Sequence, residues 1–384
     1  MPVPILKILA EEKYFAGNPM LVALWTYENK ASVFVIYDEY NSTELYRGEI
    51  YSISGWATTD ISGIFKRRHV TAGSGYYKIA LVSDEYGEYA SAYFYVYAGG
   101  VSKLLHRRLL TIPNSGNIFD YKIKNQNGNF LLTTRSFDTL ICIPEDELLP
   151  LSYYSKGMKF SVKNGINVLL ARDHSLDEIE TVASIDFAAL RETAAINLNR
   201  WISEFRIETD NGWACTVLIT ASEVVSDYSL KFLNSFGVYE KICLQADIDN
   251  APDFSESEMI MEFDSQVNDF VSKNQRKEIN DKYLVAIPYV NTHKLSFVRD
   301  LILSDNVLMS ISGVEYKCNV KMQSGQVLNS TTGEPLSINI EIKLVDSDEY
   351  HSPILPDTTF NYDNRTYLTI NGDRILIENS YITL

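Results

Sequence analysis

The sequence predicts a mainly β protein: tandem antiparallel β-sandwich domains, a third β-rich domain with a short helix, and a C-terminal hairpin tail. Two observations predict this class. The chain of 384 residues contains 25 Tyr and 17 Phe against 19 Gly and 11 Pro, and aromatic residues favour strands. Apolar residues also alternate with polar ones over many short segments, which is typical of half-buried strands. A chain of this length has room for two or three domains.

Residues 1–100 are predicted to form the first sandwich. Four segments alternate with period two: Leu21–Trp25, Ser32–Tyr37, Tyr76–Val82 and Ser91–Tyr97. The acidic turn sequence Asp84–Gly87 separates the last two and predicts a hairpin. The pair Gly99-Gly100 ends the alternating run, and we place the first boundary there. Short strands at this spacing predict a sandwich or barrel.

Residues 101–225 are predicted to form a second sandwich related to the first. Thr58–Phe65 is echoed by Ala183–Leu190, with a shared Asp and a similar apolar pattern. Each echo precedes two strands joined by an acidic turn, the second at Asp210–Gly212. The entry sequence Phe15–Pro19 is similarly echoed by Asn114–Ile118. Three matches in one order predict a duplicated domain.

Residues 226–352 are predicted to form the β-rich third domain, and residues 353–384 the tail. In the third domain, Lys294–Ser304 has helical apolar spacing, whereas Leu336–Val345 alternates strictly. In the tail, Asn371-Gly372 supplies the turn of a hairpin. An isolated hairpin is marginal in water, so it must dock on its own domain or on a neighbouring chain. The sequence leaves these two alternatives open.

The charge argues against nucleic acid as a partner, because the chain carries a formal net charge of −16. The two short basic clusters, Lys66–His69 and His106–Arg108, are interpreted as local salt-bridge or loop features. No segment is apolar over the length that a membrane span needs, and the N-terminus lacks an export-signal pattern. The sequence therefore predicts a soluble protein made in the cytoplasm, without membrane insertion.

No residue is assigned a catalytic, cofactor-binding or metal-binding role, and no cofactor is expected. The cysteines Cys142, Cys215, Cys243 and Cys318 are widely spaced beside apolar neighbours and are interpreted as free, buried thiols. The cluster Asp173–Glu178 is interpreted as an acidic loop or helix start, with calcium as the alternative.

The sequence contains no nucleophile-elbow, phosphate-loop or dinucleotide-binding motif, and Gly73–Gly75 is interpreted as a turn. A glycosidase is not excluded, because two carboxylates on distant strands leave no linear motif. The tryptophans Trp56, Trp201 and Trp213 are interpreted as core residues, with sugar stacking as the alternative.

Two segments resemble a known class of proteins. Tyr228–Glu240 contains a strand, a Leu-Asn-x-x-Gly turn and an aromatic residue, and a helix–Ser–strand unit follows at Phe297–Met309. This arrangement resembles tail proteins of Bacteroidetes phages and prophages, whose N-terminal entry and Asp-Ile-Ser element are similar to Phe15–Pro19 and Asp60–Ser62. The resemblance carries over no catalytic residue, and no peptidase or fibre-tip segment is present.

The resemblance implies a virion structural protein of distal-tail or baseplate type. We therefore expect a non-enzymatic subunit, made in the bacterial cytoplasm, that forms a homo-oligomeric ring or a complex with other tail proteins. Its contacts would use sandwich edges and the C-terminal tail. The alternative is a carbohydrate-binding surface protein built from tandem sandwiches, which the Tyr and Trp content favours.

Overall fold

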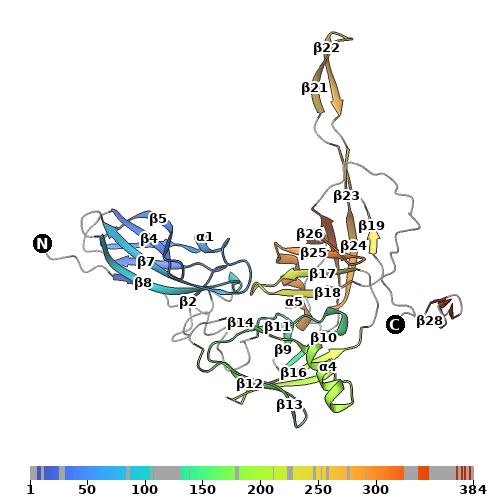
Figure 1. The fold of residues 1–384 in the computed structure, drawn as a ribbon. Coiled ribbons are helices and arrows are strands. Elements are labelled where there is room, and N and C mark those ends of the chain that lie inside the picture. Colours follow the sequence, from blue (N-terminus) through green and yellow to red (C-terminus); the bar gives the residue numbers. More distant parts are fainter. Residues whose placement is uncertain are drawn as a thin grey trace. The chain divides into compact units, whose positions relative to one another are not determined.

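The computed structural model describes residues 7–9, 13–25, 31–83, 87–103, 107, 131–137, 139–177, 181–210, 212–222, 228–244, 248–251, 253–256, 259–274, 277–290, 292–323, 336–345, 369–370, 373–374, 376–377 and 380–381. The chain is mainly β, as the sequence predicts, and its sheets are predominantly antiparallel (Figure 1). It divides into two compact units. The first comprises residues 1–253 and 280–346, and the second residues 254–279 and 347–384.

The first domain contains a five-stranded and a three-stranded sheet. The larger has the order β2 (Lys13–Phe15), β8 (Gly87–Tyr97), β7 (Ser74–Ser83), β4 (Ala31–Asp38) and β5 (Thr43–Tyr51). The smaller has the order β1 (Lys7–Leu9), β3 (Leu21–Trp25) and β6 (Trp56–Asp60), and the one-turn helix α1 (Ser62–Phe65) follows it. Alternate residues such as Val22, Phe34 and Phe94 are buried in one core cluster, which fits the period-two pattern.

The second domain has a six-stranded and a two-stranded sheet. The larger has the order β13 (Asn167–Asp173), β12 (Lys159–Asn164), β15 (Glu204–Thr209), β16 (Ala214–Thr220), β10 (Leu140–Pro144) and β9 (Ser136–Phe137). The smaller pairs β11 (Leu151–Tyr154) with β14 (Val182–Ile185). A 3₁₀ turn, η1 (Glu145–Glu147), and a helix, α4 (Phe187–Leu198), complete it.

Helix α4 is an element that the sequence analysis did not predict. It begins after Asp186, whose side chain accepts a hydrogen bond of 3.1 Å from the backbone N–H of Ala189. Its buried residues are Phe187, Arg191 and Ala194. An arginine on the buried face breaks the apolar periodicity by which a sequence reveals a helix.

The two sandwiches share one strand order. The order β2-β8-β7-β4-β5 in the first corresponds to β10-β16-β15-β12-β13 in the second. In each set of five strands, the strand that comes first in the chain pairs in parallel with the strand that comes last (β2 with β8, β10 with β16). A separate antiparallel pair, β3 with β6 or β11 with β14, precedes the helix of the domain. The echoed Asp60 is the last residue of β6, two residues before α1, and the echoed Asp186 follows β14 and directly precedes α4. The further echo at Asn114–Ile118 lies outside the described residues.

The corresponding edge strands also share an irregularity. In β5, Leu45 is an extra residue between the pairs Ile36–Tyr46 and Tyr37–Glu44. In β13, Leu169 is the extra residue, and it lies two pairs from the turn, as Leu45 does. A bulge at an edge strand disturbs the hydrogen-bond ladder and discourages pairing with another chain.

The third domain is an antiparallel seven-stranded sheet with one helix. Its order is β18 (Tyr239–Cys243), β17 (Tyr228–Leu233), β25 (Val307–Ile311), β26 (Val314–Met322), β27 (Leu336–Leu344), β24 (Lys282–Val290) and β19 (Ile248–Asn250). Helix α5 (Thr292–Leu303) coincides with the predicted helix. Its residues Leu295, Val298 and Leu301 are buried in the core cluster of this sheet.

The second compact unit is a set of short paired strands. It contains the hairpin of β21 (Met259–Asp264) and β22 (Asp269–Asn274) and the pair β20 (Asp253–Glu256) with β23 (Lys277–Asn280). In the tail, β28 (Thr369–Ile370) pairs with β29 (Asp373–Arg374), and the predicted turn residues Asn371 and Gly372 lie outside the described residues. The last pair is β30 (Leu376–Ile377) with β31 (Ser380–Tyr381). The rest of the predicted tail lies outside the described residues.

Candidate functional site

The turn between β17 and β18, residues 234–238, joins the three β domains, and we call it the junction turn. The side chain of Asn234 holds its shape, because Oδ1 accepts hydrogen bonds from the backbone N–H groups of Phe236 (2.9 Å) and Val238 (3.1 Å). Gly237 has a positive φ of 74°, which closes the turn. These residues form the Leu-Asn-x-x-Gly segment on which the sequence resemblance rests.

Two backbone hydrogen bonds connect the junction turn to the first domain. The N–H of Ala72 donates to the carbonyl of Gly237 at 2.6 Å, and the N–H of Gly100 donates to that of Ser235 at 2.8 Å. The chains approach so closely that a β-carbon on Gly237 would lie 2.8 Å from the carbonyl oxygen of Val70. Glycine is therefore required here for space as well as for its φ angle.

The same turn is bonded to the second domain. The Asn234 side-chain amide donates to the carbonyl of Leu132 at 2.9 Å and to Oε1 of Glu240 at 2.7 Å. Oε1 of Glu240 also accepts a hydrogen bond of 3.1 Å from the backbone N–H of Thr134. Residues about 100 positions apart in the chain are thus held together by one buried amide and one buried carboxylate.

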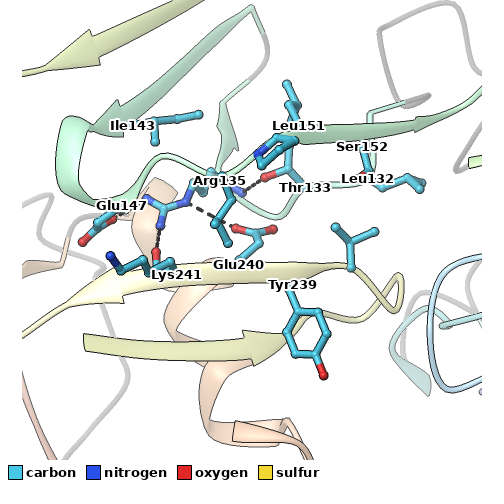
Figure 2. Close-up of a pocket in the computed structure, with 13 residues that line it drawn as sticks. Leu132, Thr133, Arg135, Ile143, Glu147, Leu151, Ser152, Tyr239, Glu240 and Lys241 are labelled. Carbon is cyan, nitrogen blue, oxygen red and sulfur yellow. Dashed lines mark hydrogen bonds and ion pairs between the residues drawn. The ribbon is translucent and has the colours of Figure 1, made fainter. Parts of the chain in front are cut away.

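Arg135 forms the centre of a buried ionic cluster beside this turn (Figure 2). Its Nη1 lies 2.8 Å from Oε2 of Glu147, and its Nε lies 3.3 Å from Oε2 of Glu240. Its Nη2 donates to the carbonyl of Lys241. All three ionic side chains are less than a tenth exposed, and the guanidinium also lies 3.9 Å from the ring centroid of Phe297 in α5.

The cluster holds two carboxylates against one guanidinium. Burial raises the pKa of Glu240, and Arg135 and the hydrogen bonds from Asn234 and Thr134 oppose that shift only in part. Glu147 is bonded on its other side, where Oε1 accepts from the N–H of Cys243 at 2.9 Å. Desolvation is costly for such groups, so removing one partner leaves an uncompensated buried charge.

Apolar packing reinforces the junction. One cluster of buried side chains takes members from all three domains: Phe15, Tyr97, Leu132, Tyr154 and Phe236. The rings of Tyr97 and Tyr154 meet edge to face with centroids 5.1 Å apart. On the side of the third domain, Ser235 donates from its N–H (2.7 Å) and its hydroxyl (2.8 Å) to Asp300 of α5.

The cavity at the junction is too small for a substrate. Its volume is about 30 Å³, and its lining includes Arg135, Glu147, Glu240 and Leu151. Ligand pockets for small molecules have volumes on the order of 300 Å³ or more. Arg135 pairs with both carboxylates, and the arrangement therefore fixes the geometry between domains rather than presenting an acid, a base or a nucleophile.

The clusters singled out in the sequence are placed as follows. Asp173 is the last residue of β13, and its Oδ1 accepts a hydrogen bond of 3.1 Å from the N–H of Ser175. His174 follows the strand, and its Nδ1 lies 2.8 Å from Oδ2 of Asp177. Within the described part of the chain, no three His, Cys, Asp or Glu side chains gather as metal ligands. Of the basic clusters, 66–69 follows α1 and 106–108 lies mostly outside the described residues.

Two interpretations of the sequence were wrong. Trp56 is 50% exposed and Trp201 is 56% exposed, whereas Trp213 packs partly against the core. Cys142 is exposed, because alternation along β10 buries its neighbours Ile141 and Ile143 and turns residue 142 to the other face. The other three cysteines are buried or partly buried free thiols.

The sequence analysis missed the junction residues Arg135, Glu147 and Glu240. They come from the segment before β9, from η1 and from β18, and no spacing rule brings these together. The available signal was Asn234, an Asn three residues before a Gly at a strand end, which is typical of a side-chain-stabilised turn.

No family model and no curated protein matches the sequence. Among solved structures, the fibronectin(III)-like modules of Clostridium thermocellum CbhA match over 58% of this chain and 97% of theirs, at 9% identity and a TM-score of 0.17. The Dpr2 Ig1-Ig2 complex with DIP-Theta Ig1-Ig3 matches over 58% of this chain and 100% of its own, at 10% identity and a TM-score of 0.18. At these scores the similarities carry no argument about function.

Among the described residues, no helix is long and apolar enough to cross a bilayer. The fold is that of a multidomain β protein, and within residues 1–253 and 280–346 the junction turn is bonded to the first and second domains.

Proposed function

We propose that this chain is a structural subunit of a phage tail or baseplate, in which three β domains act as one rigid piece. The observation that carries the proposal is the junction turn. Its residues Asn234, Ser235 and Gly237 bond to the second domain, to helix α5 and to the first domain. The segment that contains this turn is also the one that resembles Bacteroidetes phage and prophage tail proteins.

A rigid connection between domains suits a particle component. A subunit that transmits force or defines spacing needs fixed angles between its domains, whereas flexibly linked binding modules do not. Inter-domain contacts within one chain are otherwise often mobile. Here the contact combines a buried ionic cluster around Arg135, an aromatic cluster and backbone hydrogen bonds.

We propose fewer contact surfaces between subunits than the sequence analysis expected. The edge strands β5 and β13 each contain a bulge, at Leu45 and Leu169, and such edges resist strand addition. The proposal therefore locates contacts between subunits at the hairpins and the tail rather than at these two edges.

The test is detection of the chain in particles. Particles released from a strain that carries the gene are purified and analysed by mass spectrometry and electron microscopy. The proposal expects the chain at a fixed copy number, and its absence from intact particles would overturn it. Gly99→Ala, which disturbs the junction, should reduce incorporation relative to Gly313→Ala, which lies in an open turn.

A second candidate function, glycan binding, is favoured by exposed aromatic side chains on the first domain. Trp56 is half exposed, and Tyr76, Tyr93 and Tyr95 lie together on the outer face of β7 and β8, with the rings of Tyr76 and Tyr93 stacked 5.8 Å apart. A glycan array compares the unchanged protein with Trp56→Ala and Tyr93→Ala. Binding that both substitutions abolish would favour this function over the structural one.

A further inference from the structure

The seven-stranded sheet of the third domain has an apolar face and a basic face. Alternate residues of its strands, such as Phe232, Val320 and Ile342, are buried in the core cluster together with residues of α5. The residues between them lie on the opposite face, because successive side chains of a strand point to opposite sides of the sheet. Six lysines occupy such positions, and we call them the lysine band: Lys231, Lys241, Lys282, Lys317, Lys321 and Lys343.

The charge of this face is opposite to that of the molecule. Three carboxylates share the face in the described strands: those of Glu315, of Glu341 and of Asp249, which pairs with Leu284. Six lysines against three carboxylates leave an excess of three positive charges. The whole chain, by contrast, has a formal net charge of −16. A basic surface on so acidic a chain is suited to an acidic partner.

Two pairs of these lysines are direct neighbours across the sheet. Lys231 lies opposite Lys241 in the register of β17 and β18, and Lys282 lies opposite Lys343 in that of β24 and β27. Like charges directly opposite each other destabilise a sheet. A bound anion placed over each pair would remove that repulsion, so the arrangement favours an anionic ligand.

The carboxylates of the same face neutralise only part of the band. Glu315 Oε1 lies 3.4 Å from Nζ of Lys231, and Glu341 Oε2 lies 2.8 Å from Nζ of Lys282. Within the part of the chain that the structure describes, three further lysines form no ion pair: Lys241, Lys317 and Lys321. The last two are also exposed to solvent. These three side chains are therefore available to a partner.

The lysines are spread over most of the width of the sheet. In the strand order, Lys241 and Lys231 lie on the first two strands, whereas the other four lie on the fourth, fifth and sixth. Neighbouring strands are about 4.8 Å apart, so the band is about 24 Å long, which is the length of about seven extended residues. We propose that the lysine band binds an extended, carboxylate-rich segment of a partner protein, which lies across the strands. This inference goes beyond the tail role and does not depend on it.

The composition of the face favours carboxylates over the phosphates of a nucleic acid. All the cations in its described strands are lysines, whereas arginine is the residue that grips phosphate in two-pronged fashion. Sites for single-stranded nucleic acid also combine basic groups with aromatic rings on which bases stack. The one aromatic ring on this face within the described residues is that of Tyr239, and Nζ of Lys231 lies 5.0 Å from its centroid.

The experiment measures binding of full-length protein to a fluorescent oligoglutamate of about ten residues, which is long enough to span the band. The test variant combines Lys241→Gln, Lys317→Gln and Lys321→Gln. The control variant loses the same charge from the exposed basic cluster of the first domain, through Lys66→Gln, Arg67→Gln and Arg68→Gln. Fluorescence anisotropy at low ionic strength gives the three dissociation constants, and urea unfolding checks that each variant is folded.

The test variant is expected to bind about ten-fold more weakly than the unchanged protein, because three charge contacts are lost, and the control should stay within about two-fold. Binding by the unchanged protein should disappear at about 1 M salt, where the Debye length is about 3 Å. Absence of binding at low ionic strength, equal weakening in both variants, or binding that persists in high salt would overturn the proposal. An oligothymidylate of the same length is compared in parallel, and tighter binding to it than to the oligoglutamate would overturn the choice of an acidic protein segment.

Discussion

Gly99 lies against the main chain of Ser235, so closely that a β-carbon on Gly99 would overlap the carbonyl oxygen of Ser235. That oxygen accepts the hydrogen bond of 2.8 Å from the next residue, Gly100. The predicted domain boundary is therefore a packing site, where the end of the first domain fits against the junction turn of the third. A pair of glycines in a sequence is usually interpreted as a flexible linker. Here Gly99 and Gly100 permit a close contact with the backbone of Ser235.

Gly99→Ala should lower the free energy of unfolding by about 3 kcal/mol or more, because steric overlap is added to backbone strain. Gly313→Ala is the matched control. Its φ of 84° is close to the 85° of Gly99, but nothing lies within 4 Å of the added β-carbon. The free energy of unfolding of this control should fall by only about 1–2 kcal/mol, because the alanine adds only the strain of a left-handed backbone conformation. Urea unfolding measures both, and equal losses would show that the contact with Ser235 does not matter.

Arg135→Met should destabilise the chain by about 3–5 kcal/mol at neutral pH, because it leaves Glu147 and Glu240 buried without their cation. Arg47→Met removes an arginine whose pair with Glu44 is exposed, and its stability should match that of the unchanged protein within error. Thermal unfolding of the two variants tests the difference. A similar small effect from both would mean that the buried cluster contributes nothing to the junction.

The fold was more predictable than the junction. The alternation of apolar and polar residues located the strands because alternate residues of a strand face the core. The echoed Asp60 and Asp186 both precede the helix in two domains that share one strand order. Helix α4 was not predicted because Arg191, a charged residue, occupies a position on its buried face where the pattern requires an apolar one. Arg135 and Glu240 could not be paired by sequence reasoning, since they meet only after the second and third domains have packed together.

Glu240 gives the junction a pH dependence. Burial raises its pKa in the folded state above the unfolded value, so the folded state holds the proton more tightly. The stability that Glu240 contributes is therefore fully present below its unfolded pKa and is lost as pH rises through the folded pKa. In Glu240→Gln this loss is absent, and the stability of the variant relative to the unchanged protein should increase with pH.

Urea unfolding of both proteins between about pH 5 and pH 8 measures that difference, which cancels the contributions of other titrating groups. The other charged groups near Glu240 are Arg135, Glu147, Lys241 and Asp300, and Asp300 raises its pKa further. Parallel stability curves for the two proteins would mean that Glu240 titrates alike in the folded and unfolded chain.

The four cysteines should differ sharply in reactivity. Burial raises the pKa of Cys215, Cys243 and Cys318 to about 12, so at neutral pH almost none of each is present as the reactive thiolate. Cys142 is the exposed thiol, with a pKa that partial burial also raises. Native protein should therefore take up one equivalent of a maleimide reagent rapidly at pH 7, and unfolded protein should take up four. Cys142→Ser should abolish the rapid phase.

A rapid phase that survives this substitution would show that one of the other thiols becomes accessible in the folded chain, and peptide mapping would identify it. Cys243 is the informative case, because its Sγ donates to the carbonyl of Asp146 at 3.4 Å and its exposure requires the contact between η1 and β18 to open. Labelling of Cys243 in the Arg135→Met variant but not in the unchanged protein would locate the loss of stability at the junction.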